Sequence, residues 1–151
     1  MARTLHTEIE ISASATRVWG VLADFKSYPL WNPLLRGMQG TLTAGSRLRV
    51  SVRLAWWFRM IIHPIVLHAE VPRDLRWKGI LIIPSLFDGV HAFEVRHLGA
   101  NRVKLIQSET FSGMLVPIIL PFILGLMRRG FHAMNVSLKE VAESGSHSEV
   151  P

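Results

Sequence analysis

One long amphipathic segment near the C-terminus limits most strongly what this chain can fold into. From about Pro117 to Ser144, apolar residues recur at three- or four-residue steps, which predicts one long helix, bent near Pro121 or Gly125. Its most apolar stretch, Met114 to Met127, has 14 residues, fewer than the roughly 20 of a membrane-spanning helix. We therefore expect a buried helix, or one whose apolar face covers something. Because Arg128 and Arg129 follow, association with a membrane surface is an alternative.

Strand patterns fill most of the chain before this helix. Residues 4–11 alternate as a first strand, and residues 12–25 show helical spacing after a serine N-cap at Ser12 or Ser14. A turn or a short second helix follows, and then about six strands, of which residues 47–54 alternate most clearly. An antiparallel sheet must cover its apolar face, and the terminal helix is the one substantial cover available. The sequence predicts an α+β fold with a curved antiparallel sheet of about 6–7 strands around that helix.

Composition limits the classes of protein to consider. The 151 residues suit one domain, residues 1–144, followed by a polar tail, residues 145–151. The chain has no cysteine, which excludes disulfides and thiolate chemistry, and "MARTLHTEIEIS" lacks the apolar core of a signal peptide, so we expect a cytoplasmic protein. The net charge is +6, but the basic residues are spread along the chain without a nucleic-acid motif. We expect no nucleic-acid partner.

The segment "GAN" at residues 99–101 predicts a hairpin turn. A simple antiparallel register then places Leu98 opposite Arg102 and His91 opposite Glu109. One face of the hairpin would carry His91, Phe93, Val95, Leu105, Gln107, Glu109 and Phe111. Polar side chains on this otherwise apolar face indicate a cavity there instead of packed core.

The pair His91 and Glu109 has three interpretations. It can act as a general base with an orienting carboxylate, or it can hold a polar group of a ligand by hydrogen bonds. Alternatively the two side chains only satisfy each other, because buried polar groups are normally paired. A register slip of one residue would turn both side chains outward.

Aromatic residues supply bulk near this face, and ordinary core packing explains most of them. We place Trp31, in "LWNP", near a cavity mouth. In "AWWFRM", at least one of Trp56, Trp57 and Phe58 must face outward, where it can touch a membrane or a protein partner. The seven histidines lack the spacing of a metal site, so we expect neither a metal nor another cofactor.

The segments "VWGVLADFKSYPLWNP", "HAFEV", "RVKLIQSETFSGMLVP" and "RRGFHAMNVSLKEVAE" resemble the polyketide cyclase/dehydrase-like branch of the START-like (SRPBCC) superfamily. The resemblance covers about residues 4–143. It implies a helix-grip fold with a cavity under the C-terminal helix that holds a hydrophobic small molecule, such as a lipid, an isoprenoid or an aromatic metabolite. The candidate ligand-binding residues are His91, Phe93, Gln107, Glu109, Phe111, Trp31, Trp77 and Phe131.

Three functions remain open at this stage, because one fold can carry many activities. The first is binding, and possible transport, of a small molecule. The second is a cyclase, dehydratase or hydrolase that uses the same cavity, although the sequence contains no catalytic motif that can be carried over. The third is a module that meets a membrane surface through "AWWFRM" and its basic charge.

Overall fold

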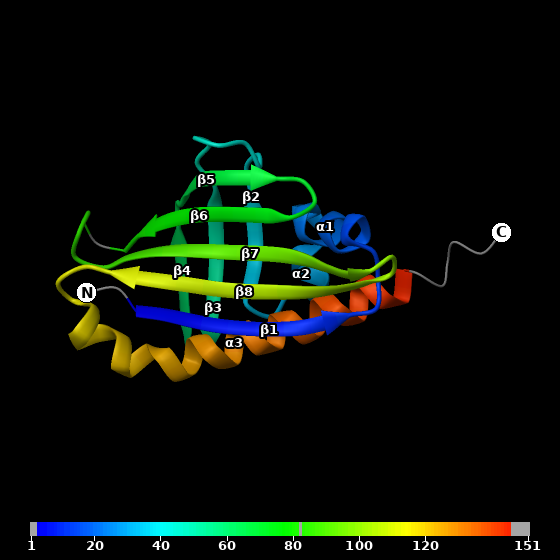
Figure 1. The fold of residues 1–151 in the computed structure, drawn as a ribbon. Coiled ribbons are helices and arrows are strands. Elements are labelled where there is room, and N and C mark those ends of the chain that lie inside the picture. Colours follow the sequence, from blue (N-terminus) through cyan, green and yellow to red (C-terminus); the bar gives the residue numbers. More distant parts are fainter. Residues whose placement is uncertain (1–2, 82, 146–151) are drawn as a thin grey trace.

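The computed structural model describes residues 3–81 and 83–145, which form eight strands, three α-helices and one 3-10 helix (Figure 1). In chain order these are β1 (Arg3–Ile11), α1 (Ala15–Ala23), η1 (Phe25–Ser27), α2 (Tyr28–Trp31), β2 (Leu35–Gln39), β3 (Arg49–Ala55), β4 (Phe58–Ile62), β5 (Ile65–Glu70), β6 (Asp74–Ile80), β7 (Asp88–Gly99), β8 (Arg102–Ser112) and α3 (Val116–Gly145). Apart from Gly145, which ends α3, the polar tail predicted at residues 145–151 lies outside the described residues.

The strands form two antiparallel sheets. Five strands pair in the order β1-β8-β7-β6-β5, and three pair in the order β2-β3-β4. The predicted α+β architecture is confirmed, but the strands number eight and divide between two sheets. Pro64 explains the division, because it lies between β4 and β5 and cannot donate a backbone hydrogen bond to a ladder.

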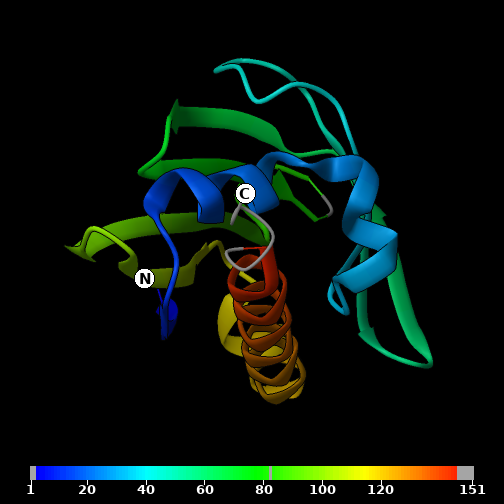
Figure 2. The same cartoon turned by 90° about the vertical axis from the view of Figure 1, so that its right-hand side faces the viewer.

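The long helix α3 packs along the larger sheet, beside β1 and α1 (Figure 2). Its C-terminal half is fixed there by polar contacts: Asn135 Nδ2 donates to Thr7 Oγ1 at 3.0 Å, and Lys139 Nζ donates to the Glu10 carbonyl at 2.8 Å. The helix was predicted from about Pro117 to Ser144 and extends one residue further at each end. The helix-grip prediction is therefore confirmed.

Helix α1 closes one end of the molecule. Ser14 is its N-cap, since the backbone N–H of Arg17 donates to Ser14 Oγ at 3.1 Å. The guanidinium of Arg17 reaches the end of α3 and donates to the carbonyls of Val141 (3.0 Å) and Ala142 (3.3 Å). A cation at a helix C-terminus satisfies carbonyls that the helix itself leaves unpaired. The two helices are thus locked together where α3 ends.

The β7–β8 hairpin has the predicted register over most of its length. His91 lies opposite Glu109, and Phe93 lies opposite Gln107. The prediction for Leu98 is wrong, because Gly99 and not Leu98 pairs with Arg102. The register shifts between His97 and Gly99, so Leu98 is an extra residue beside the turn. The irregularity is confined to the turn, and the inward face further along the strands keeps its predicted composition.

Candidate ligand cavity

A cavity of about 100 Å³ lies between the two sheets and α3. The smaller sheet contributes Val50, Val52, Met60 and Ile62, the larger sheet Trp77, His91, Glu109 and Phe111, and α3 contributes Ile123, Met127 and Phe131. The lining runs from the buried Trp77 and Phe111 to the exposed Ile80 and Leu81, so the mouth lies near residues 80–81. His91 and Glu109 are the two polar side chains in this lining. The cavity is therefore apolar apart from one His–Glu pair.

The Glu109 carboxylate occupies space that a glycine leaves free. Gly89 lies on the neighbouring strand β7, and a Cβ atom at this position would collide with Glu109 Oε1. Glu109 can therefore lean over the backbone of β7 while its side chain stays only 17% exposed. A glycine inside a strand often marks such a close approach. The sequence analysis did not single out Gly89, although a glycine two residues before His91 in a strand was a usable signal.

His91 lies behind this carboxylate, and both of its ring nitrogens face polar groups. Nδ1 is 3.5 Å from Glu109 Oε2, and Nε2 is 3.1 Å from the amide nitrogen of Gln107. The same amide nitrogen lies 3.4 Å from the Met134 sulfur, which is an acceptor, so the N–H side of the amide faces both groups. His91 Nε2 then accepts, and Nδ1 carries the hydrogen that points toward Glu109.

Aromatic rings hold the imidazole of His91 in this orientation. Trp77 stacks on it with centroids 5.0 Å apart and planes 12° apart, while Phe93 (4.8 Å) and Phe131 (5.0 Å) contact it at steeper angles. Gln107 is fully buried, and its carbonyl oxygen has no hydrogen-bond partner among the residues that the structure describes. An unpaired buried carbonyl costs about 1–3 kcal/mol. The chain therefore tolerates a local cost to keep a polar group next to His91.

The structure brings five of the eight predicted ligand-binding residues to the cavity wall: Trp77, His91, Glu109, Phe111 and Phe131. Phe93 and Gln107 are fully buried and contact His91 instead of lining the cavity. Trp31 is not part of the lining; its ring packs edge-on against Tyr28, with centroids 5.2 Å apart. A ligand-binding role for any of the eight residues stays a prediction.

Sequence reasoning missed the contribution of the smaller sheet. The alternation of residues 47–54 indicated that Val50, Val52 and Leu54 point inward, but not that they face the same space as Glu109. That depends on how two sheets meet around α3, which a local pattern does not determine.

Among residues 3–81 and 83–145, no three His, Asp or Glu side chains gather as metal ligands would.

Comparison with known proteins agrees with this architecture. The model of the family described as "Polyketide cyclase / dehydrase and lipid transport" matches residues 2–143. No protein with a curated description matches the chain.

Several solved structures share the fold at low sequence identity. The Zhui aromatase/cyclase from Streptomyces sp. R1128 is 19% identical with a TM-score of 0.77, over 95% of this chain and 94% of the other. A norcoclaurine synthase point mutant from Thalictrum flavum is 16% identical with a TM-score of 0.74, over 97% of both chains. A START superfamily protein from Mycobacterium smegmatis is 20% identical with a TM-score of 0.73, over 93% of this chain and 97% of the other. The chain therefore belongs to the polyketide cyclase/dehydrase and lipid transport family, and it has a START-like fold.

Proposed function

We propose that this protein binds a hydrophobic small molecule in the cavity between its sheets and α3, and that the ligand carries a neutral or cationic hydrogen-bond donor. The observation that carries the proposal is the polarity of the wall, which is apolar except for Glu109 and His91. A ligand hydroxyl or amine can donate to the carboxylate, whereas a ligand carboxylate would meet a like charge. The cytoplasm stays the predicted location.

The size of the cavity favours a ring over a long chain. Its volume of about 100 Å³ is below that of an engineered apolar cavity of roughly 150 Å³ that binds benzene. A lipid or isoprenoid would therefore have most of its length outside the mouth near Ile80 and Leu81, while an aromatic molecule of one or two rings would have only one edge there. Among the ligands that the family resemblance implies, an aromatic metabolite fits best. Enclosing about 150 Å² of apolar surface gives roughly 4 kcal/mol, so a hydrogen bond to Glu109 is needed for affinity of about 100 µM or better.

Paired probes of the same shape test the proposal. At neutral pH, 2-naphthol is a neutral donor and 2-naphthoate is an anion of similar size, and both can be titrated by calorimetry. We expect 2-naphthol to bind and 2-naphthoate to bind at least about tenfold more weakly, because of the like charge. Glu109→Gln should remove this discrimination. Glu94→Gln, on the outward face of the same hairpin, is the control and should preserve it.

Two outcomes contradict the proposal. If the folded protein binds neither probe, and native mass spectrometry finds no small molecule carried through purification, the cavity does not act as a binding site. If 2-naphthoate binds as tightly as 2-naphthol and Glu109→Gln changes neither affinity, the polar side chains of the cavity wall do not select the ligand.

A second function, catalysis in the same cavity, is favoured by one observation: the Glu109 carboxylate is part of the cavity wall, and the His91 imidazole lies 3.5 Å behind it. In this arrangement the carboxylate, and not His91, would take a proton from a substrate, because His91 Nε2 is already engaged by Gln107. Cyclase or dehydratase turnover of an aromatic polyketide-like substrate that is lost in Glu109→Gln but retained in Glu94→Gln would support it. Turnover that survives Glu109→Gln would exclude this role.

A further inference from the structure

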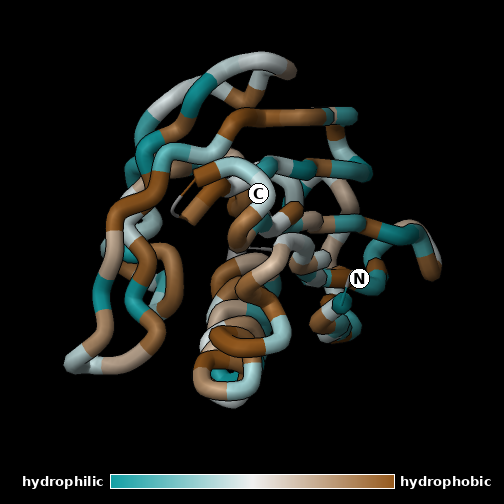
Figure 3. Tube along the Cα trace, turned by 90° about the vertical axis from the view of Figure 1, so that its left-hand side faces the viewer, coloured by the Kyte–Doolittle hydropathy of each residue, from teal (hydrophilic) through white to brown (hydrophobic). Residues whose placement is uncertain are grey.

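The first half of α3 exposes much of the most apolar stretch in the chain. Of residues 114–127, only Val116, Leu120 and Met127 are buried. Met114, Ile118 and Phe122 face outward at four-residue spacing, and Phe122 is 82% exposed. Figure 3, seen from the side on which α3 begins, shows hydrophobic stretches along this part of the helix. The sequence analysis expected this segment to be buried or to cover something, but none of the residues that the structure describes covers its outward side.

Two exposed tryptophans lie at the same side of the molecule. Trp56 and Trp57 form the turn between β3 and β4, and Trp56 is 79% exposed. In Figures 1 and 2 this turn and the first half of α3 both reach the lower edge of the molecule, with the hairpin beside the helix. We call these five exposed residues, Met114, Ile118, Phe122, Trp56 and Trp57, the docking face. The cavity is close to these elements, since Met60 on β4 and Ile123 on α3 line it.

The docking face is bordered by cations without acidic neighbours. The sequence has no Asp or Glu between residues 25 and 69 or between residues 110 and 139. Arg53, Arg59, Arg128 and Arg129 lie in these segments, and no ion pair joins any of them to a carboxylate of the described residues. Arg53 and Arg59 lie directly opposite each other on β3 and β4, which is an unfavourable like-charge pair. An anionic partner would relieve that repulsion.

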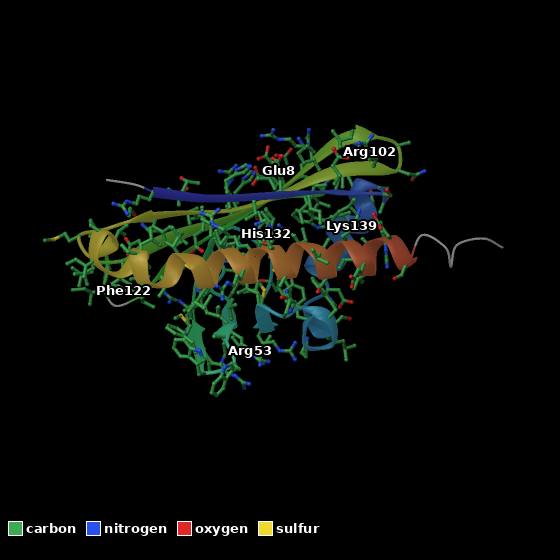
Figure 4. The ribbon with its side chains drawn as sticks, turned by 90° about the horizontal axis from the view of Figure 1, so that it is seen from below. Glu8, Arg53, Arg102, Phe122, His132 and Lys139 are labelled. Atoms are coloured by element: carbon green, nitrogen blue, oxygen red, sulfur yellow. The ribbon has the colours of Figure 1, made fainter. Side chains whose placement is uncertain are left out.

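The outer face of the larger sheet has the opposite character. There, ion pairs join Arg96 to Glu94, Arg76 to Asp74 and Arg102 to Glu10. Figure 4, seen from below, has Glu8 and Arg102 on the side of β1, and Phe122 and Arg53 toward the β3–β4 side. Uncompensated positive charge is thus concentrated where the exposed apolar side chains are.

From this combination we infer that the docking face binds the surface of an anionic lipid membrane. Exposed Trp, Phe and Ile side chains can enter the boundary between headgroups and acyl chains, and arginines around them meet lipid phosphates and carboxylates. A second copy of the chain fits this face poorly, because a two-fold contact would bring the arginines of one copy against those of the other. A nucleic acid would use the arginines but would leave the apolar side chains without a role.

The helix lies along the membrane in this arrangement and does not cross it. By length and composition alone, α3 is long and apolar enough to cross a membrane, as some core helices of soluble proteins also are. Its C-terminal half is held on the sheet by the hydrogen bonds of Asn135 and Lys139. Only the first half is free to meet lipid. This partner surface is additional to the proposed ligand binding.

Vesicle flotation of the purified full chain tests the inference. Vesicles of phosphatidylcholine alone are compared with vesicles that also contain phosphatidylglycerol, at low and at high salt. We expect flotation with the anionic vesicles, weakened by salt, and little with the neutral ones. Phe122→Ser should weaken binding about tenfold or more, because it removes a large apolar group from the lipid. Arg128→Glu combined with Arg129→Glu should weaken vesicle binding at least tenfold, because each basic residue near an anionic membrane surface contributes about fivefold to the affinity.

Matched controls separate the docking face from general effects. Leu98→Ser removes an exposed apolar residue at the far β7–β8 turn, and Lys26→Glu combined with Arg96→Glu changes the net charge equally elsewhere. Both controls should bind anionic vesicles as the unchanged protein does. Equal binding to neutral and anionic vesicles, no binding to either, or equal losses in control and test variants would overturn the inference. So would a dimer in light scattering that Phe122→Ser dissolves. None of these results depends on 2-naphthol binding.

Discussion

Replacing His91 and Gln107 by leucine, singly and together, tests the polar contact behind the cavity wall. The Gln107 amide nitrogen lies 3.1 Å from His91 Nε2, while the Gln107 carbonyl has no hydrogen-bond partner within the described part of the chain. Gln107→Leu leaves His91 Nε2 without a donor, which costs about 1–3 kcal/mol, but it also removes a buried carbonyl whose burial costs a similar amount. We therefore expect the free energy of unfolding of Gln107→Leu to stay within about 1 kcal/mol of the unchanged protein.

His91→Leu should be more damaging. It removes the ring that packs against Trp77, Phe93 and Phe131 and leaves the Gln107 amide with only the Met134 sulfur as partner. The expected loss is about 2–4 kcal/mol. In the double variant neither polar group remains, so its loss should be smaller than the sum of the two single losses by about 1–3 kcal/mol.

Urea unfolding followed by circular dichroism measures this coupling free energy. An exposed pair provides the control: Thr4 Oγ1 and Thr110 Oγ1 are 3.1 Å apart, and water can replace either hydroxyl. A cycle of Thr4→Val and Thr110→Val should give a coupling near zero. If the losses at His91 and Gln107 simply add to within about 0.5 kcal/mol, the two side chains do not share a hydrogen bond and the assigned tautomer of His91 is wrong.

Three further predictions concern the frame around the cavity. Tyr28→Phe should cost about 1–3 kcal/mol, because the buried Tyr28 hydroxyl donates to the Leu22 carbonyl. Burial raises the pKa of Tyr28 above its usual value of 10.0, so the stability that this side chain contributes is present below pH 10.0 and is lost as the pH rises above it. The free energy of unfolding in urea should therefore fall less steeply with pH in this range for Tyr28→Phe than for the unchanged protein. The side chain of Lys139 and the backbone N–H of Ser12 lower the pKa of Glu143 below 4.5, so the stability that Glu143 contributes is present above that pH and is lost as the pH falls below it. Glu143→Gln should lower the free energy of unfolding by about 0.5–1 kcal/mol at neutral pH and by nothing in acid. If the variant is destabilised equally in acid, the pKa shift is not the cause. Gly113→Ala should lower the free energy of unfolding by more than about 2 kcal/mol, because Gly113 has φ +127° and an added Cβ would collide with the Leu86 carbonyl. Gly99→Ala is the control and should change stability little, because an added Cβ there meets nothing within 4 Å. Equal losses in the two variants would refute the steric argument.

The sequence predicted the inner face of the β7–β8 hairpin because strand periodicity and turn chemistry are local. His91, Gln107 and Glu109 followed from a turn at residues 99–101 and a simple register, and the bulge at Leu98 did not disturb them. The same locality explains the long helix, whose bounds were predicted to within one residue.

What the sequence did not predict depends on contacts between distant segments. Trp31 was placed at the cavity mouth because it lies near a turn, but Tyr28, three residues earlier, offers its ring as a packing surface. The role of Gly89 appears only when Glu109, twenty residues later, is seen leaning over it. The exposure of Phe122 was missed because hydrophobic periodicity identifies an apolar face without showing whether the rest of the chain is large enough to cover it.

The length of α3 provides the last test, because it separates a structural role of the exposed face from a role in docking. The helix has 30 residues and is about 45 Å long, whereas an 11-residue strand such as β8 spans only about 36 Å. The buried Val116 and Leu120 hold the first turns of the helix against the core, whereas Phe122, 82% exposed on the opposite side of these turns, contributes little to folding. Phe122→Ser and Ile118→Ser should therefore each change the free energy of unfolding by less than about 0.5 kcal/mol in urea while weakening vesicle binding. A loss of 2 kcal/mol or more in the monomer, comparable to a core substitution, would mean that these side chains are covered in solution by the protein itself and are not available to a membrane.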